Sequence, residues 1–324
     1  MISRKKLEKT RIGLGLAAIG RPEYINIREH PDKDKAESSY RQRALDLLEF
    51  AYGSGVRDFY TAASYGKGEQ FLTEWYDDKR YPDVRLSSKW GYTYKANWEI
   101  GYKGPHEVKE HSLGKLREQW SNAEDLLPGL KTYQIHSATF ESGVLENKEV
   151  LEELNRIKNA VGIQIGISVS GANQKDVISA AAKIEVGGKD LFDSFQVTYN
   201  ILDSSTHMVL CSLLAQGKAV IVKEAMANGR LLQNSNFPQY ESLYRLMDEI
   251  ATDHRVGTDA IALRYVIDSL SPTLVLSGAS TGPQLASNLK ALSIQLNEEE
   301  MKSLKRLGIA PEDYWSERKQ LSWN

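Results

Sequence analysis

The sequence contains one cysteine, Cys211, among 324 residues. A single thiol excludes an intramolecular disulfide and a multi-cysteine metal site, and it is typical of a protein from the reducing cytosol. Neither sign of charge predominates: the sequence has 41 basic and 43 acidic side chains, which give a net charge of −2. A dominant nucleic-acid or anionic-membrane partner usually goes with a basic excess, so we expect neither.

Long hydrophobic stretches are absent as well. The hydrophobic fraction of 41% and the mean hydropathy of −0.44 are typical of a soluble protein and exclude a bundle of membrane helices. The charged start of the chain, Met1–Lys6, is followed by no apolar segment of the kind found in secretory signals, so we expect a cytoplasmic protein. A linker rich in proline, glycine and serine is missing too. Although the length would allow two domains, we therefore predict one.

Short apolar segments alternate with helical patterns along the whole chain. Eight segments are expected to form strands: Arg11–Ile19, Asp58–Ser64, Val84–Trp90, Lys131–Ser137, Ile163–Ser170, Ser194–Asn200, Ala219–Ala225 and Thr273–Ala279. The apolar spacing between and after them predicts helices over Tyr40–Ala51, Glu69–Tyr76, His106–Ser121, Lys148–Ala160, Gln174–Ile184, His207–Gln216, Pro283–Leu292 and Glu298–Leu307, with two more inside Tyr240–Leu270. Repeated strand–helix units imply a parallel sheet, because a parallel crossover needs a connection of helix length.

Eight such units in a chain of this length predict a single α/β domain folded as a (β/α)8 TIM barrel. A doubly wound open sheet is the alternative that the pattern leaves open. The longest connections after strands span about 91–105, 137–147 and 226–239, and a tail follows at about 309–324. In a barrel the three loops lie at the C-terminal ends of the strands, where active sites form.

A glycine motif near the start of the chain resembles the phosphate loop of a Rossmann fold. The segment Gly13-Leu-Gly15-Leu-Ala-Ala18 matches G-x-G-x-x-A, a motif in which a helix must continue from the last small residue. Here Gly20 and Pro22 follow at once, and proline in a helix interior costs about 3 kcal/mol. We therefore interpret the small residues as sites where the first strand closely approaches its neighbours or a ligand.

Three ionisable residues end three different predicted strands: Tyr65, Lys89 and His136. Barrel enzymes take their catalytic residues from several strand ends, although each of these side chains also has an ordinary structural explanation. A neighbouring ammonium favours the phenolate form of a tyrosine and so lowers its pKa, while a neutral imidazole can orient a carbonyl oxygen. Together the three could protonate a carbonyl oxygen as a hydride arrives from a cofactor.

The segments around these residues resemble the aldo-keto reductase family over almost the whole chain. They run in the family's order: Gly-Val-Arg-Asp-Phe-Tyr-Thr-Ala-Ala-Ser-Tyr65-Gly, Ser-Lys89-Trp-Gly, Tyr-Gln-Ile-His136, Ile-Gly166-Ile-Ser168, Gln196-Val-Thr-Tyr199-Asn200 and Ser-Gly278-Ala-Ser280. The resemblance implies an NAD(P)-dependent oxidoreductase that reduces an aldehyde or ketone to an alcohol, or catalyses the reverse reaction. It makes Tyr65 the proton donor, Lys89 the residue that lowers its pKa and His136 the residue that orients the substrate.

The resemblance also implies where the cofactor, NADP or NAD, binds. Ser168 and Gln196 would hold the carboxamide, with one contact fewer than usual because Val169 replaces an asparagine. Lys223 stands where an aromatic ring often contacts the nicotinamide, and it could reach a phosphate. Four further cofactor positions follow the last strand: Gly278, Ser280, Gln284 and Asn288. Members that prefer NADP often have an arginine at the position of Gln284, so the choice between the two cofactors stays open.

One position departs from the family's catalytic set. The family has an aspartate five residues before the tyrosine, and Tyr60 occupies that position here. Without that carboxylate, a partly buried Lys89 tends toward a lower pKa and the neutral form. Asp58 points the same way along the strand, roughly 7 Å away, so we hypothesise that it reaches Lys89 instead. In the competing hypothesis, Tyr60 fills the position and leaves a weakened site.

Loop residues set the substrate, which the sequence does not identify beyond a small carbonyl or alcohol compound. Trp90 and Trp98 are predicted to line an apolar pocket suited to a ring-bearing substrate, and no metal site is predicted. Two alternatives to the reductase remain open. One is a cofactor-binding barrel with weak or no catalysis, because of Tyr60. The other is an aldolase that forms a Schiff base at Lys89, since such lysines are desolvated or lie near another cation.

Overall fold

Eight parallel strands close into a barrel in this computed structural model, which describes residues 11–24 and 34–321. Around the barrel they follow the order β1-β12-β11-β10-β7-β6-β3-β2. The strands are β1 (Arg11–Gly15), β2 (Asp58–Tyr60), β3 (Arg85–Trp90), β6 (Leu130–Ala138), β7 (Gln164–Val169), β10 (Ser194–Thr198), β11 (Ala219–Lys223) and β12 (Leu274–Ser277). Each coincides with a predicted strand, so the (β/α)8 barrel is confirmed and the open sheet is excluded.

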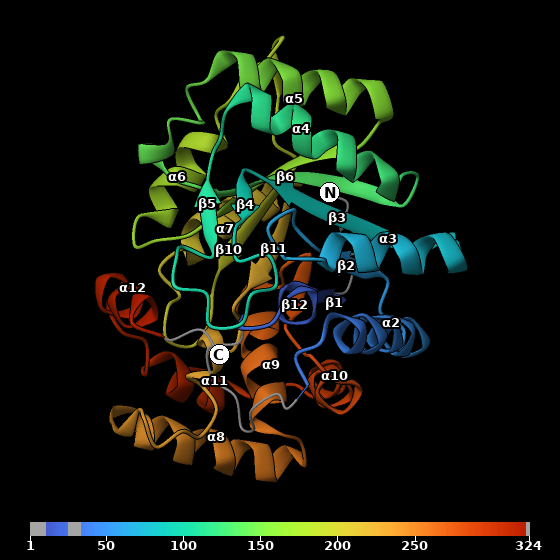
Figure 1. The fold of residues 1–324 in the computed structure, drawn as a ribbon. Coiled ribbons are helices and arrows are strands. Elements are labelled where there is room, and N and C mark those ends of the chain that lie inside the picture. Colours follow the sequence, from blue (N-terminus) through green and yellow to red (C-terminus); the bar gives the residue numbers. More distant parts are fainter. Residues whose placement is uncertain (1–10, 25–33, 322–324) are drawn as a thin grey trace.

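Helices surround the barrel (Figure 1), and their buried apolar residues belong to the same hydrophobic core as those of the strands. They are α2 (Glu37–Gly53), α3 (Gly68–Lys79), α4 (Leu113–Ala123), α5 (Lys148–Val161), α6 (Gln174–Ala181), α7 (His207–Ala215), α8 (Glu241–His254), α9 (Thr258–Leu270), α10 (Gly282–Leu289), α11 (Glu298–Lys305) and α12 (Pro311–Lys319). In α5 the predicted stripe of Leu151, Leu154 and Ile157 is buried, as the helical period requires. Within the described ranges, none of the helices is both long and apolar enough to cross a bilayer.

The predicted helix over His106–Ser121 is wrong in its first third. Residues Glu107–Lys109 form strand β5, which pairs antiparallel with β4 (Tyr92–Tyr94), and α4 begins only at Leu113. Ser112 caps that helix by accepting a hydrogen bond from the Lys115 backbone at 3.1 Å. The predicted loop at 91–105 therefore contains the first strand of a β-hairpin and most of the connection to its second strand.

The remaining long connections also lie where the barrel fold predicts. The loops at 137–147 and 226–239 follow β6 and β11 and contain only single turns of 3-10 helix. The predicted tail at 309–324 is instead mostly helix α12, which begins with Pro311 in its first turn, while residues 322–324 lie outside the described ranges.

The glycine motif of β1 does not lead into a Rossmann helix. A single helical turn, α1 (Ala17–Gly20), follows β1 and ends before Pro22. A Cβ atom on Gly13 would lie 2.9 Å from the carbonyl oxygen of Asp58 in the neighbouring β2. The interpretation that these small residues allow a close approach between strands is confirmed.

Candidate active site

Tyr65, Lys89 and His136 come together at one end of the barrel. They lie just after β2, in β3 and in β6, which are three neighbouring strands. The Lys89 Nζ atom is 4.8 Å from the centroid of the Tyr65 ring, and the rings of Tyr65 and His136 meet edge to face with centroids 5.5 Å apart. The predicted convergence of the three side chains is confirmed.

Lys89 is a buried ammonium that bonds to the backbone. Its side chain points into the barrel, the residue is 2% exposed, and Nζ donates to the carbonyl oxygen of Thr61 at 2.7 Å. Burial, together with the positive charge of Lys223, lowers the pKa of Lys89 to about 7. The lowered pKa expected from the replaced aspartate is therefore confirmed.

Tyr65 behaves differently from the expectation. Burial raises its pKa well above the ordinary value, and the neighbouring Tyr24 and the negative charge of Glu107 raise it further. The ring of Tyr24 lies 5.7 Å from that of Tyr65, and the two phenols share a hydrogen bond. The Tyr65 pKa therefore lies above its ordinary value and not below it as expected, because the loss of hydration outweighs the nearby positive charge.

His136 is held in the neutral form. Burial and the nearby charges of Lys89 and Lys223 keep the pKa of His136 well below its ordinary value. Its Nδ1 atom lies 3.4 Å from the Ser64 hydroxyl, and its carbonyl oxygen accepts a hydrogen bond from His111 Nε2 at 3.0 Å. If Ser64 donates to Nδ1, the ring proton sits on Nε2 and is available to a carbonyl oxygen.

The hypothesis that Asp58 reaches Lys89 is wrong. The Asp58 carboxylate accepts hydrogen bonds from Arg85 at 2.8 and 2.7 Å and from Arg11 at 3.0 Å. Asp58 is paired in register with Arg85 at the start of β3, four residues before Lys89, so the two groups lie at different levels of the barrel. The two arginines satisfy the buried carboxylate there.

Tyr60 lies in the barrel interior. The residue is 7% exposed and packs against Ile221 and Leu274, which belong to strands on the same side of the barrel as β1. Burial and the charge of Asp58 raise the pKa of Tyr60 above its ordinary value, so it stays neutral. It therefore supplies no charge to Lys89.

The predicted substrate-binding tryptophans do not line the site. Trp90 is fully buried. Because side chains alternate along a strand, it faces away from the barrel interior that Lys89 enters. Trp98 packs against Tyr40 and Phe71, with ring centroids 5.3 and 6.5 Å away. Both tryptophans support the surrounding loops and helices from outside the barrel.

A group of side chains that the sequence analysis does not predict lies beside the trio of Tyr65, Lys89 and His136 and forms a wall of the site. Arg21 is 1% exposed, and its guanidinium lies over the rings of Tyr24 and Tyr94 at 4.8 and 5.1 Å. It pairs with Glu107 of the β4–β5 hairpin at 3.3 Å, and Tyr92 of the same hairpin packs on His136 with centroids 4.9 Å apart. The signal available was Arg21 beside the helix-breaking Pro22, but the hairpin that completes the wall was predicted as loop and helix.

The two positions expected to hold a carboxamide are neighbours. Ser168 and Gln196 are paired in register on β7 and β10, and both are almost fully buried. The Ser168 hydroxyl accepts a hydrogen bond from the backbone of Ser137 at 2.9 Å, whereas the Nε2 atom of Gln196 has no hydrogen-bond partner among the described residues. A buried amide donor without a partner suits a ligand that brings a carbonyl oxygen.

Lys223 lies at the end of β11, close to this pair. Its ammonium donates to Ser170 at 2.9 Å and to Thr198 at 3.2 Å, and burial lowers its pKa to about 8. Glu224, next along the chain, is hydrogen-bonded by Arg318 of α12, a contact that the sequence analysis did not foresee. Lys223 would have to leave these strand-end partners to reach a phosphate.

The four positions after β12 differ in how open they are. The backbone at Gly278 is exposed, and within the described part of the chain no other group lies within 4 Å of where a Cβ would be. Gln284 accepts hydrogen bonds from the backbone and hydroxyl of Ser280 at 2.9 and 3.1 Å. Asn288 is buried and bonds to Ser277 and Asp259, both at 2.6 Å, so its amide is already engaged.

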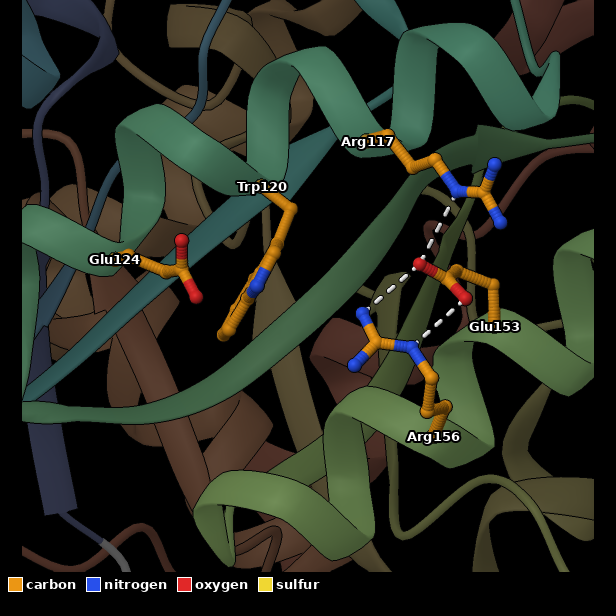
Figure 2. A pocket seen from close by; sticks show the side chains of 5 residues that line it. All are labelled: Arg117, Trp120, Glu124, Glu153 and Arg156. Carbon is orange, nitrogen blue, oxygen red and sulfur yellow. Dashed lines mark hydrogen bonds and ion pairs between the residues drawn. The ribbon is translucent and has the colours of Figure 1, made fainter.

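A separate hollow of about 450 Å³ lies on the outer surface between α4 and α5. Figure 2 shows its lining residues, Arg117, Trp120, Glu124, Glu153 and Arg156. Glu153 accepts hydrogen bonds from both arginines, at 3.3 Å from Arg117 and at 2.9 and 3.0 Å from Arg156. None of the predicted site residues lines this hollow, and its charges neutralise one another.

Comparison with known proteins points to the same family that the sequence motifs resemble. The model of the Aldo/keto reductase family matches residues 11–309. Aldo-keto reductase ausK of Aspergillus calidoustus is 24% identical over 304 residues, covering 83% of this chain and 73% of the relative. Aryl-alcohol dehydrogenase GME11368 of Pestalotiopsis microspora is 21% identical over 291 residues, covering 82% of this chain and 72% of the relative.

The solved structures share the fold. An aldo/keto reductase from Klebsiella pneumoniae, determined in complex with NADP and acetate, superposes with a TM-score of 0.65 at 20% identity. The match covers 93% of this chain and 91% of the other. At this identity the likeness concerns the arrangement of the barrel.

Proposed function

The chain belongs to the aldo/keto reductase family, and we propose that it reduces an aldehyde or ketone to an alcohol, or catalyses the reverse, with Tyr65 exchanging the proton. The observation that carries this proposal is the meeting of Tyr65, Lys89 and His136 at neighbouring strand ends. The protein is an oxidoreductase, and its cofactor is NADP or NAD.

The chain's own residues account for the proton step. Reduction adds a hydride to the carbonyl carbon and a proton to its oxygen, and the nicotinamide supplies the hydride when bound. Because its pKa is raised, Tyr65 is protonated at neutral pH; its O–H bond breaks as the proton moves to the carbonyl oxygen. The Lys89 charge stabilises the resulting phenolate, which solvent reprotonates, and neutral His136 orients the carbonyl oxygen.

The residues present fit a nicotinamide cofactor. Gln196, with its unpartnered buried amide, and Ser168 would hold the carboxamide. The open backbone at Gly278 leaves room for a phosphate or ribose oxygen, with Ser280 beside it. Gln284 brings no positive charge for the additional phosphate of NADP, so we propose that either NADP or NAD is accepted. Asn288 would contact adenine only through the hydrogen bonds that its amide can still form beside those to Ser277 and Asp259.

We propose a ring-bearing carbonyl compound as the substrate. Tyr24, Tyr92 and Tyr94 present aromatic faces and polar tips beside the trio, and aromatic pairs favour edge-to-face or offset contacts. The relative from Pestalotiopsis microspora that is named an aryl-alcohol dehydrogenase fits this choice. A small molecule is the only partner that the site requires, and a cytoplasmic location remains a prediction.

The test combines cofactor binding with turnover. Purified protein should quench or enhance NADPH or NADH fluorescence on binding, and should oxidise the bound cofactor when aromatic aldehydes are added. Binding without oxidation across the aldehyde panel would favour the second candidate, a cofactor-binding barrel with weak catalysis. The observation behind that candidate is neutral Tyr60 in place of the expected aspartate. Absence of binding would refute both.

A further inference from the structure

Lys89 and Glu69 lie on opposite sides of β3, and each lacks a close partner of opposite charge. Within the part of the chain that the structure describes, neither forms an ion pair within 4.0 Å. Lys89 enters the barrel and is 2% exposed, whereas Ser88, the preceding residue, faces the outer layer. A buried charge without a counter-charge is costly, so complementary charges on the two faces of one strand stabilise each other.

The first turn of α3 places Glu69 against β3. The Ser88 hydroxyl donates a hydrogen bond to the Glu69 carboxylate. A Cβ atom on Gly68 would lie 3.2 Å from the Thr61 side-chain oxygen, so the start of α3 packs directly on Thr61. Thr61 is also the residue whose carbonyl oxygen accepts from Lys89 at 2.7 Å, and the two charges therefore flank a common residue.

The other charged groups around Lys89 are engaged elsewhere or have the wrong sign. Lys223 repels it, and neutral His136 supplies no charge. Glu107 attracts it but is paired with Arg21 at 3.3 Å. Among the described residues, Glu69 is therefore the carboxylate near Lys89 that forms no ion pair with another cation.

The surroundings of Glu69 allow it to carry a charge. Burial raises its pKa, while the Ser88 hydrogen bond and the charge of Lys89 lower it, and the more distant Asp125 opposes ionisation. The Tyr133 phenol is buried nearby and neutral. Glu69 also lies in the first turn of α3, where the helix dipole favours a negative charge.

We propose that Glu69 is a positioning residue that keeps Lys89 charged from the outer side of β3, the role that the family gives to an aspartate at the position of Tyr60. The proposal rests on the proposed function, because the Lys89 charge matters through the Tyr65 phenolate that it stabilises. Glu69 touches neither substrate nor cofactor in this scheme and acts only through Lys89.

Glu69→Gln tests the proposal, because glutamine keeps the Ser88 hydrogen bond and removes only the charge. The activity of the wild-type enzyme should fall as Lys89 deprotonates, and in Glu69→Gln the midpoint of that fall should move roughly one pH unit lower. Glu69→Asp should restore most of the wild-type profile. Glu74→Gln makes the same change further along α3, where Glu74 pairs with Arg41 of α2, and its profile should match the wild type.

A second measurement does not depend on turnover. Lysine labelled with 13C at Cε is titrated by NMR, with the Lys89 signal assigned from Lys89→Arg. The Lys89 midpoint should fall in Glu69→Gln; if that variant fails to fold, Ser88→Ala should lower it in the same direction by releasing the carboxylate. An unchanged midpoint overturns the proposal even if the enzyme is active. A shifted midpoint in a protein that reduces no carbonyl compound refutes the proposed function and supports the electrostatic pairing.

Discussion

The Lys89 ammonium lies over the face of the Tyr65 ring, 4.8 Å from its centroid, while its hydrogen bond goes to the Thr61 backbone. A cation in this position interacts with the neutral ring only modestly, but it attracts the phenolate that forms when Tyr65 gives up its proton. The stabilisation is therefore larger for the transition state than for the resting enzyme, which is the condition for catalysis.

Tyr65→Phe removes the proposed proton donor and leaves the ring that packs on His136 and Tyr24. We expect kcat for carbonyl reduction to fall by about 10²–10⁴-fold, the usual contribution of a general acid. The cofactor Kd, measured by fluorescence titration, should stay within about twofold, because the phenol is not among the proposed cofactor residues. A loss of kcat smaller than tenfold would show that another group supplies the proton.

The pH dependence of activity follows from the sign of the Lys89 charge. Lysine is cationic below its pKa, and burial has lowered that pKa from 10.5 to about 7. The rate of carbonyl reduction should therefore be highest below neutral pH and should decline as pH rises through about 7, long before Tyr65 ionises. Lys89→Met should reduce the rate and abolish this decline. A rate that stays constant to pH 9 would contradict the assignment.

Asp58→Asn separates folding from catalysis. Asp58 pairs with Arg11 and Arg85, whose side chains are 35% and 38% exposed, so solvent screens part of the interaction. We expect the free energy of unfolding to fall by about 1–3 kcal/mol, less than for a fully buried network. Denaturant unfolding measures that loss, while kcat should remain within about threefold of the wild type. A selective loss of kcat with unchanged stability would revive the hypothesis that Asp58 serves Lys89.

Sequence periodicity was enough to predict the barrel because strand and helix patterns differ in period and recur eight times. The short strand β5 was missed since its three residues precede α4 and extend the apparent helical pattern. Its pairing with β4 is a contact across a hairpin, and local propensity carries little information about such a contact.

The grouping of Tyr65, Lys89 and His136 was predictable because each lies near or shortly after the C-terminal end of a strand, and the strand order brings these ends together. Partners of buried charges were not predictable in this way. The replaced family aspartate and strand alternation suggested Lys89 as the partner of Asp58, but the register between β2 and β3 sets Asp58 opposite Arg85. The wall of Arg21 and Tyr24 depends on a loop folding against a distant hairpin, which no spacing in the sequence encodes.

Tyr24→Ala tests whether the substrate binds against this wall or against the predicted tryptophans. An aromatic contact is worth about 0.5–1.5 kcal/mol beyond its buried area, so the KM for an aromatic aldehyde should rise by about 2–12-fold. The KM for a short aliphatic aldehyde should change less, because it has no ring to pack on Tyr24. Trp98→Phe is the matched control: Trp98 packs on Tyr40 and Phe71 outside the barrel, so both KM values should stay unchanged. A raised KM in Trp98→Phe with a normal value in Tyr24→Ala would place the substrate at Trp98 instead.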